Sequence, residues 1–307
     1  MVIHDRSYSR WKGDRAAPVK GATVVLEAGI KRGVATLFRR KLPAIVLILA
    51  AFGPFIFFLG VIYIRAYILG NVEKFGEGFI EFANDSEVVR MTTANPEWIY
   101  SYMILTQWAF VMVACVLLGA PLIAEDRRAN ALELYLSRPI SVRQYLLGKL
   151  ATIGTFVAML TVIPASILIL AQLSVSWSDP GEPLRLAGLL ARTLVAGAVW
   201  VAIPSLTITT ASSLADRARN AAILWLSVVV MLEFVVSNIL REVFNADAFW
   251  LLQIGFNVRQ VVNLVLGNTA DLVTTVPVWA SVLVLAGWAV LCLRVLAARV
   301  RPVQVVA

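Results

Sequence analysis

Six stretches of this chain are long enough and apolar enough to cross a membrane as helices. A spanning helix needs about 20 mostly apolar residues, because the hydrocarbon layer is about 30 Å thick and a helix rises about 1.5 Å per residue. Apolar residues make up 60% of the 307 residues and charged residues only 15%, against about 25% in soluble proteins. The sequence therefore predicts an all-α membrane protein and excludes a soluble enzyme or a disordered chain. The predicted spans are 43–64, 98–124, 150–178, 193–215, 220–240 and 272–293.

The distribution of Lys and Arg predicts the orientation of these spans. If the N-terminus is cytoplasmic, 20 of the 27 basic residues fall on the cytoplasmic side, as the positive-inside rule requires. Of the 19 acidic residues, 12 lie on the opposite side or in the outer half of a span. Both termini are therefore predicted to be cytoplasmic. The net charge of +8 mostly reflects this bias, so it gives no reason to expect a nucleic-acid partner.

The chain divides into a polar tail (1–20), an amphipathic interfacial helix (21–41), a six-helix membrane domain (42–300) and a short cytoplasmic C-terminus (301–307). The interfacial helix is predicted because apolar residues recur at helical spacing among basic ones. A simple basic anchor for anionic lipid would use the same residues, so both interpretations stay open. The apolar positions are Leu26, Ile30, Val34 and Leu37.

Two further segments carry an apolar stripe but are too short to cross the membrane. The first lies in the loop after the first span, and the second precedes the last span. Each is expected to rest on the outer surface or to enter the membrane partway, either as passive packing or as part of a substrate path. The first stripe is Phe75, Phe79 and Phe82; the second is Leu251, Ile254, Val258, Val261 and Val265, with Asn257, Arg259, Gln260 and Asn263 facing away from it.

The connection between the second and third spans has the strongest local signals. Helical spacing continues through Leu132 and Leu136, and Pro139 disfavours helix at the residue before it. Ser141, followed three residues later by Gln144, forms a capping box that predicts the start of a new helix. The segment is therefore predicted to be a helix, a break and a second helix on the cytoplasmic face.

This segment resembles the ABC type-2 transporter permeases, the membrane subunits of a class of bacterial ABC exporters. The resemblance extends to the layout of a basic elbow helix, six spans and a short polar turn between the fourth and fifth spans. One departure is Ala131 directly before Leu132, where the family more often has glycine and threonine nearby. The matching residues are Glu125-Asp126-Arg127-Arg128, Ala129, Leu132-Glu133-Leu134, Ser137-Arg138-Pro139 and Gly148-Lys149.

The resemblance implies a permease of the bacterial cytoplasmic membrane that forms a homodimer and docks onto two copies of an ATP-binding cassette ATPase. The 125–149 connection would meet this ATPase, with charged residues at the rim of the contact and apolar residues at its centre. The alternative is that the charges only anchor the two spans, which would account for the arginines but not for the acids or for the break at Pro139 and Ser141. The candidate contact residues are Glu125, Asp126, Arg127, Arg128, Leu132, Glu133, Leu136, Arg138 and Pro139.

The chain has no phosphate-binding motif of its own. Its one Gly-Lys pair, Gly148-Lys149, is followed by Leu150 at the start of a span and does not fit the G-x-x-x-x-G-K-[ST] pattern. ATP and Mg²⁺ are therefore expected on the partner subunit, and this chain is expected to carry no cofactor. The single histidine, His4, and the two cysteines in apolar runs, Cys115 and Cys292, offer no metal cluster and no catalytic triad.

Glu233 is the one charged residue inside a predicted span. A carboxylate at mid-membrane costs about 2.5–3.5 kcal/mol on insertion scales, so it should face protein or water. Counting about 1.5 Å per residue puts Glu233 about 12 Å before Arg241 and Arg192 about 9 Å below the outer face. These matching depths predict that Glu233 pairs with Arg192, either as a structural lock or as part of a substrate path.

Two other classes of function compete with an exporter permease. A stand-alone secondary transporter or channel would be expected to carry more buried charge and an internal repeat. An intramembrane enzyme would need several polar catalytic groups in its spans. The sequence favours the permease over both.

Overall fold

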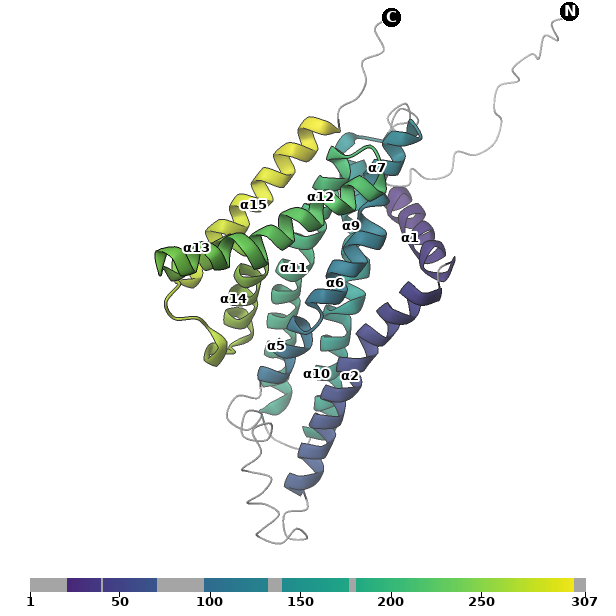
Figure 1. Cartoon of the computed structure of the whole chain (residues 1–307). Coiled ribbons are helices and arrows are strands. Elements are labelled where there is room, and N and C mark those ends of the chain that lie inside the picture. Colours follow the sequence, from purple (N-terminus) through teal and green to yellow (C-terminus); the bar gives the residue numbers. More distant parts are fainter. Residues whose placement is uncertain (1–20, 40, 71–96, 132–139, 177–180, 301–307) are drawn as a thin grey trace, which may run out of the picture.

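The computed structural model describes residues 21–39, 41–70, 97–131, 140–176 and 181–300, and these residues form a bundle of helices (Figure 1). Six helical segments within them are long and apolar enough to cross a membrane, as the sequence predicts. The described chain begins and ends at the same end of the bundle (Figure 1). The six segments are Ala44–Ile64, Trp98–Arg128, Val142–Ser176, Glu182–Leu214, Ala218–Phe244 and Val278–Arg299.

Several spans consist of more than one helix. The first span lies within α2, which follows α1. The fourth span is the single helix α11, and the sixth span is the single helix α15. The second, third and fifth are each interrupted, and two of them contain a π-helical segment, η2 or η3. The elements are α1 (Gly21–Arg39), α2 (Lys41–Gly70), α5 (Trp98–Leu105), α6 (Trp108–Ala114), η2 (Cys115–Gly119), α7 (Pro121–Arg128), α9 (Val142–Leu160), α10 (Val162–Ser176), α11 (Glu182–Leu214), α12 (Ala218–Val230), η3 (Met231–Val236), α13 (Ser237–Phe244), η4 (Asp247–Leu252), α14 (Ile254–Leu266), η5 (Thr269–Asp271) and α15 (Val278–Arg299).

Helix α11 is the centre of the bundle. It packs against α7, α9, α10, α12, α14 and α15, and its buried face is rich in small and hydroxyl residues. Small residues let neighbouring backbones approach closely, and hydroxyls can bond across helices inside a membrane. At Gly197 an added Cβ would lie 2.5 Å from the side chain of Val162 in α10. The close packing of α10 on α11 therefore depends on glycine at this position.

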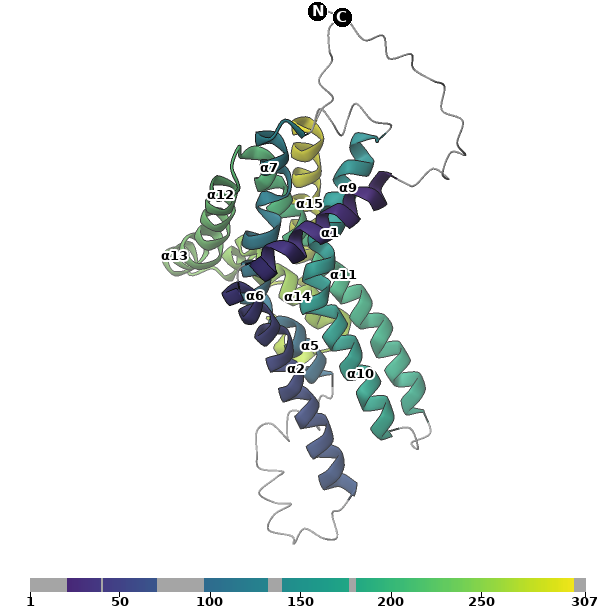
Figure 2. The same ribbon diagram turned by 90° about the vertical axis from the view of Figure 1, so that its right-hand side faces the viewer.

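Helix α1 crosses α9 near the end of the bundle where the termini lie (Figure 2). The contact face of α1 consists of Gly21, Val25, Gly29 and Gly33, one residue per helical turn. The predicted apolar residues Leu26, Ile30 and Val34 are partly buried or exposed beside this face. The structure therefore contains the predicted N-terminal helix, and its glycines bring it close to α9; of the four predicted apolar residues, Leu37 packs against the core and Val34 is exposed.

The predicted capping box at the start of the third span is confirmed. Ser141 accepts a hydrogen bond from the Gln144 backbone N–H, and the Gln144 side chain accepts one from the Ser141 N–H, at 3.2 and 3.0 Å. Helix α9 therefore begins at Val142, eight residues before the predicted span. The predicted break at Pro139 lies outside the described residues, as do the stripe of Phe75, Phe79 and Phe82 and the segments 1–20 and 301–307.

The prediction for the segment before the last span is partly wrong. Helix α14 carries the predicted apolar stripe, but its polar side is also buried: Asn257, Gln260 and Asn263 are each at most 1% exposed, and only Arg259 faces out. The polar side chains bind protein, since Ser101 bonds to Asn263 and Gln260 bonds to both backbone groups of Val273, at 3.1 Å each. Helix α14 is thus an internal helix held between α5, α11 and α15, not a surface helix.

The last span begins six residues later than predicted. Residues 272–277 form a turn after η5, in which Gln260 holds the Val273 backbone, and Pro277 lies directly before α15. Hydropathy alone counted this apolar turn as helix. The helix also continues past Leu293 to Arg299, which extends its polar end.

The glycine contact between α1 and α9 gives a first prediction. An added Cβ at Gly148 would lie 2.6 Å from Val25 Cβ and 2.9 Å from the Ala22 carbonyl oxygen. Gly148→Ala is therefore expected to lower the free energy of unfolding by about 1–3 kcal/mol, measured by SDS titration of the purified protein. Gly188→Ala is the matched control, because its Cβ would meet no atom within 4 Å. An equal loss in both variants would contradict this packing.

Candidate functional site

The carboxylate of Asp126 is the centre of a buried ionic network at the end of the bundle where the termini lie. Its side chain, in α7, is 2% exposed. Lys149 of α9 places its Nζ 2.6 Å from Oδ2, and Arg32 of α1 places its Nη1 3.2 Å from Oδ1. The hydroxyl of Tyr145 donates a further hydrogen bond to Oδ2 at 2.9 Å. One carboxylate thus joins α1, α7 and α9.

Because this network is buried, losing one of its charges is expected to lower the stability of the protein strongly. The Lys149 side chain is 5% exposed and that of Asp126 is 2% exposed, so removing one member of this pair leaves the other poorly solvated. A buried ion pair that loses one partner leaves an uncompensated charge, which costs about 3–5 kcal/mol. The positions of α1, α7 and α9 relative to one another are therefore coupled through these side chains.

Arg127, the next residue in α7, joins the turn between the fourth and fifth spans. Its Nη1 donates to the Ser213 carbonyl oxygen at 2.5 Å, and its Nη2 lies 3.2 Å from Asp216. Asp216 is 82% exposed, so the hydrogen bond to the backbone is the more sheltered of the two contacts. Arg127 thus binds α7 to the end of α11.

Ser212 adds a second connection between α7 and α11. Because α7 starts anew at Pro121 after the π-helical segment η2, the first N–H groups of α7 have no partner in their own helix. The Ser212 hydroxyl accepts from the N–H groups of Ile123 and Ala124 and donates to the Ala120 carbonyl oxygen, at 2.7–3.0 Å. Ser212 therefore serves as a cap supplied by a neighbouring helix.

These contacts change the interpretation of the predicted contact residues. Asp126 is buried, so the prediction that it meets a partner at the rim of an interface is wrong for this residue; its carboxylate is used inside the chain. Arg127 is half-buried and also used internally, while Arg128 is exposed and Glu125 is half-buried. Leu132, Glu133, Leu136, Arg138 and Pro139 lie outside the described residues.

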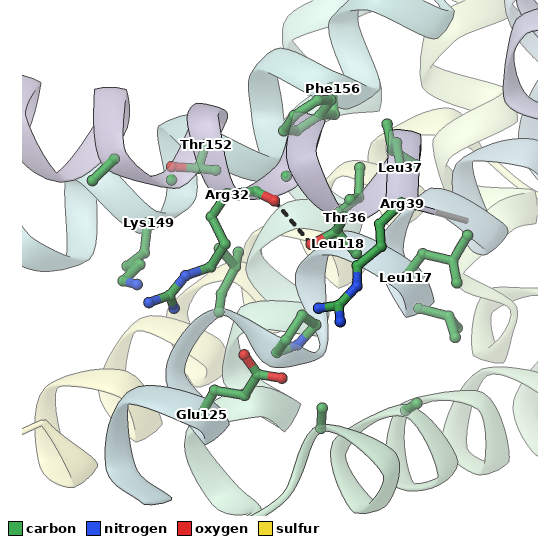
Figure 3. A pocket seen from close by; sticks show the side chains of 18 of the residues that line it. Arg32, Thr36, Leu37, Arg39, Leu117, Leu118, Glu125, Lys149, Thr152 and Phe156 are labelled. Carbon is green, nitrogen blue, oxygen red and sulfur yellow. Dashed lines mark hydrogen bonds between the residues drawn. The ribbon is translucent and has the colours of Figure 1, made fainter. Parts of the chain in front are cut away.

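A cavity of about 910 Å³ lies beside this network, between α1, η2, α7, α9 and the start of α12. Figure 3 shows the guanidinium groups of Arg32 and Arg39 pointing to the side of the cavity where Glu125 lies. Lys149 and Arg219 also line it, and the remaining lining is mostly apolar. On the outer side of α1, Lys31 forms a surface pair with Glu27 at 2.7 Å, which lowers the pKa of the Glu27 carboxyl.

Glu233 lies in the π-helical segment η3 and is 8% exposed. Its carboxylate accepts a hydrogen bond from the backbone N–H of Gly255, in the first turn of α14. A helix N-terminus favours negative charge because its free N–H groups and its dipole both point toward the anion. Glu233 also lines a cavity of about 320 Å³ together with Arg259 and three tryptophans: Trp108, Trp200 and Trp250.

The predicted pair of Glu233 and Arg192 is therefore not formed. No ion pair within 4.0 Å joins these two residues in the described part of the chain. The Arg192 side chain is exposed and lies beside Gly267. Counting residues predicted that Glu233 and Arg192 lie at the same depth in the membrane. It did not predict the direction in which each side chain points from its helix.

The sequence did not reveal that Asp126, Arg32, Tyr145 and Lys149 converge. One signal was available: Lys149 follows a capped helix start by eight residues and is surrounded by apolar neighbours, so it needs an acidic partner. The preceding acids in the sequence are Glu125, Asp126 and Glu133. That reasoning would have reduced the partner of Lys149 to these three residues, whereas the participation of Arg32 depends on how α1 folds back.

The ionic network gives the second prediction. Asp126→Asn should lower the free energy of unfolding by about 3–5 kcal/mol, because Lys149 stays buried without its counter-charge. The double variant Asp126→Asn/Lys149→Met should recover most of this loss. Asp216→Asn removes an exposed partner and is expected to cost less than about 1 kcal/mol. SDS titration of the four proteins tests this order, and an equal loss for Asp126→Asn and Asp216→Asn would contradict it.

The third prediction separates the two partners considered for Glu233. Glu233→Ala should destabilise the protein by about 1.5–3 kcal/mol, since it removes a charged acceptor from the start of α14. Arg192→Ala should change stability by no more than about 0.5 kcal/mol. The same unfolding titration measures both. A large loss for Arg192→Ala would restore the pairing that the structure argues against.

Comparison with known proteins agrees with this architecture. Residues 36–300 match the family described as ABC-2 family transporter protein, which covers all six spans. No curated protein matches the chain in sequence.

Proposed function

Because the chain belongs to the ABC-2 family of transporter proteins, we propose that it is the permease subunit of an ATP-binding cassette exporter. A permease of this kind is a multi-pass membrane component of transport and is not itself catalytic. It forms the translocation path, and a separate ATPase subunit, which carries ATP and Mg²⁺, drives it through the 125–149 connection.

The observation that carries this proposal is the set of contacts at the base of the connection. Helix α7 ends at Arg128, directly after Asp126 and Arg127, and α9 begins at Val142, so these helices hold the two ends of the connection. Asp126 joins α7 to α1 and α9, and Arg127 and Ser212 join it to α11. A force applied to the connection is therefore passed to four helices at once, as coupling to an external motor requires.

We further propose a homodimer served by two ATPase copies in the cytoplasmic membrane of a bacterium, with both termini in the cytoplasm. The distribution of basic residues supports this orientation, and the start of α1 and the end of α15 lie at one end of the bundle, so both described ends fall on the same side (Figure 1). The fifth span has a large exposed apolar surface that a second copy or lipid must cover. This surface includes Met231, Phe234, Ile239, Val243 and Phe244.

The fourth prediction tests the contact with the ATPase. Arg128 is exposed at the start of the connection, so Arg128→Glu should lower co-purification with the cassette subunit by roughly tenfold through like-charge contacts. Arg294→Glu makes the same charge change on α15 and should leave co-purification unchanged. The measurement is the ratio of the two subunits after affinity purification from the membrane. Full transport by the purified chain alone would instead indicate a stand-alone transporter.

A further inference from the structure

The lining of the cavity beside α1 combines basic and apolar side chains. Four basic side chains line it: Arg32 and Arg39 from α1, Lys149 from α9 and Arg219 from α12. Glu125 is the single acid among the described lining residues. The apolar part of the lining includes Leu37, Leu117, Leu118, Leu122 and Phe156. The lining therefore suits a molecule that carries both an anionic group and hydrocarbon.

Basic side chains outnumber acidic ones around this cavity in the described part of the chain. Arg32 and Lys149 both contact the carboxylate of Asp126. Arg39 and Arg219 form no ion pair within 4.0 Å among the described residues. Two cations of the lining, Arg39 and Arg219, are therefore in a position to bind a ligand that supplies negative charge.

The position of the cavity beside α1 points to membrane lipid as the source of a negatively charged ligand. Helix α1 has large exposed apolar side chains, Val34 at 39% and Phe38 at 69%, next to the basic residues Arg32 and Arg39. A helix with this pattern lies at the boundary between headgroups and acyl chains, with its apolar side in the membrane. The cavity opens beside α1, where phosphate headgroups are abundant. Its volume of about 910 Å³ lies within the range of small-molecule sites.

We propose that this cavity is a binding site for one anionic phospholipid. Arg39 and Arg219 contact the phosphate oxygens together with Arg32, because a guanidinium group can donate two parallel hydrogen bonds to a phosphate. The beginning of an acyl chain lies along Leu118 and Phe156. The site goes beyond the proposed exporter function, since it requires neither the ATPase nor transport.

Native mass spectrometry of the detergent-purified, delipidated chain tests the proposal. The probes are phosphatidylglycerol, phosphatidylcholine, diacylglycerol and glycerol phosphate. Phosphatidylglycerol is expected to bind one molecule per chain and at least tenfold more tightly than the zwitterionic or uncharged lipid. Glycerol phosphate should bind far more weakly than phosphatidylglycerol, because it lacks the hydrocarbon that the apolar lining residues would contact.

A matched pair of double variants separates this site from general surface charge. Arg39→Ala/Arg219→Ala removes two cations from the cavity and should weaken phosphatidylglycerol binding about 30-fold. Lys31→Ala/Arg217→Ala removes two cations from exposed positions on the same end of the bundle that do not line the cavity, and should weaken binding less than threefold. Each single variant, Arg39→Ala or Arg219→Ala, should weaken binding about fivefold and replaces the double variant if that protein loses its helical circular dichroism.

Three outcomes would overturn the proposal. Equal weakening in the two double variants would mean that the lipid responds only to total charge. Equal binding of phosphatidylglycerol and phosphatidylcholine would mean that the excess charge of the cavity is not used. Binding of glycerol phosphate as tight as that of the lipid would identify a soluble phosphoester as the ligand. None of these outcomes affects the Arg128 experiment, so failure of the lipid site and failure of the proposed function are distinguishable.

Discussion

The buried carboxylate of Asp126 is the interaction that holds together the end of the bundle where the described chain begins and ends. A carboxylate with 2% exposure must be paired, and here two cations and a hydroxyl from two other helices supply the pairing. Each of these partners has a fixed reach, so the carboxylate limits where α1 and α9 can lie. The glycines of α1 complete the constraint, because they allow the two backbones to approach closely enough for Arg32 to reach. Charge and close packing therefore act together.

Buried polar groups also need partners around helix α14, where hydrogen bonds replace the ion pairs of Asp126. Helix α14 and the turn that follows it interrupt the spans with irregular backbone, which inside a membrane is tolerated only where protein or water satisfies its polar groups. Gln260 binds the turn at Val273, and Glu233 binds the first turn of α14 at Gly255. The polar residues of α14 therefore bind protein, and the Glu233 carboxylate accepts its hydrogen bond from a helix N-terminus.

Hydropathy and local capping signals predict the spans and the start of α9, because both depend on residues close together in the sequence. They fail where the partner is distant. The depth of Glu233 and Arg192 follows from counting residues, but the direction each side chain faces depends on how η3 and α11 are rotated in the packed bundle. For α14, the spacing of polar and apolar residues was interpreted as one side facing water and one facing the membrane. In the structure, most residues on both sides of the helix are buried by protein. Polar residues inside a membrane protein can face either water or other protein, and the sequence pattern is the same.

Within the proposed function, the interruptions in the second and third spans allow the helices to bend beyond the end that the ionic network holds together. Asp126, Arg127 and Ser212 fix α1, α7, α9 and α11 to one another, so these segments move as one body when the connection is displaced. Farther along the same spans, the regular hydrogen bonding changes at η2 in the second span and at Thr161 in the third, whose φ and ψ of −121° and −69° depart from helical values. Such irregular segments are where helices bend. Movement at the cytoplasmic end can therefore change the direction of α5 and α10 without breaking the ionic network. This separates the part of the chain that receives force from the part that must open and close around a substrate.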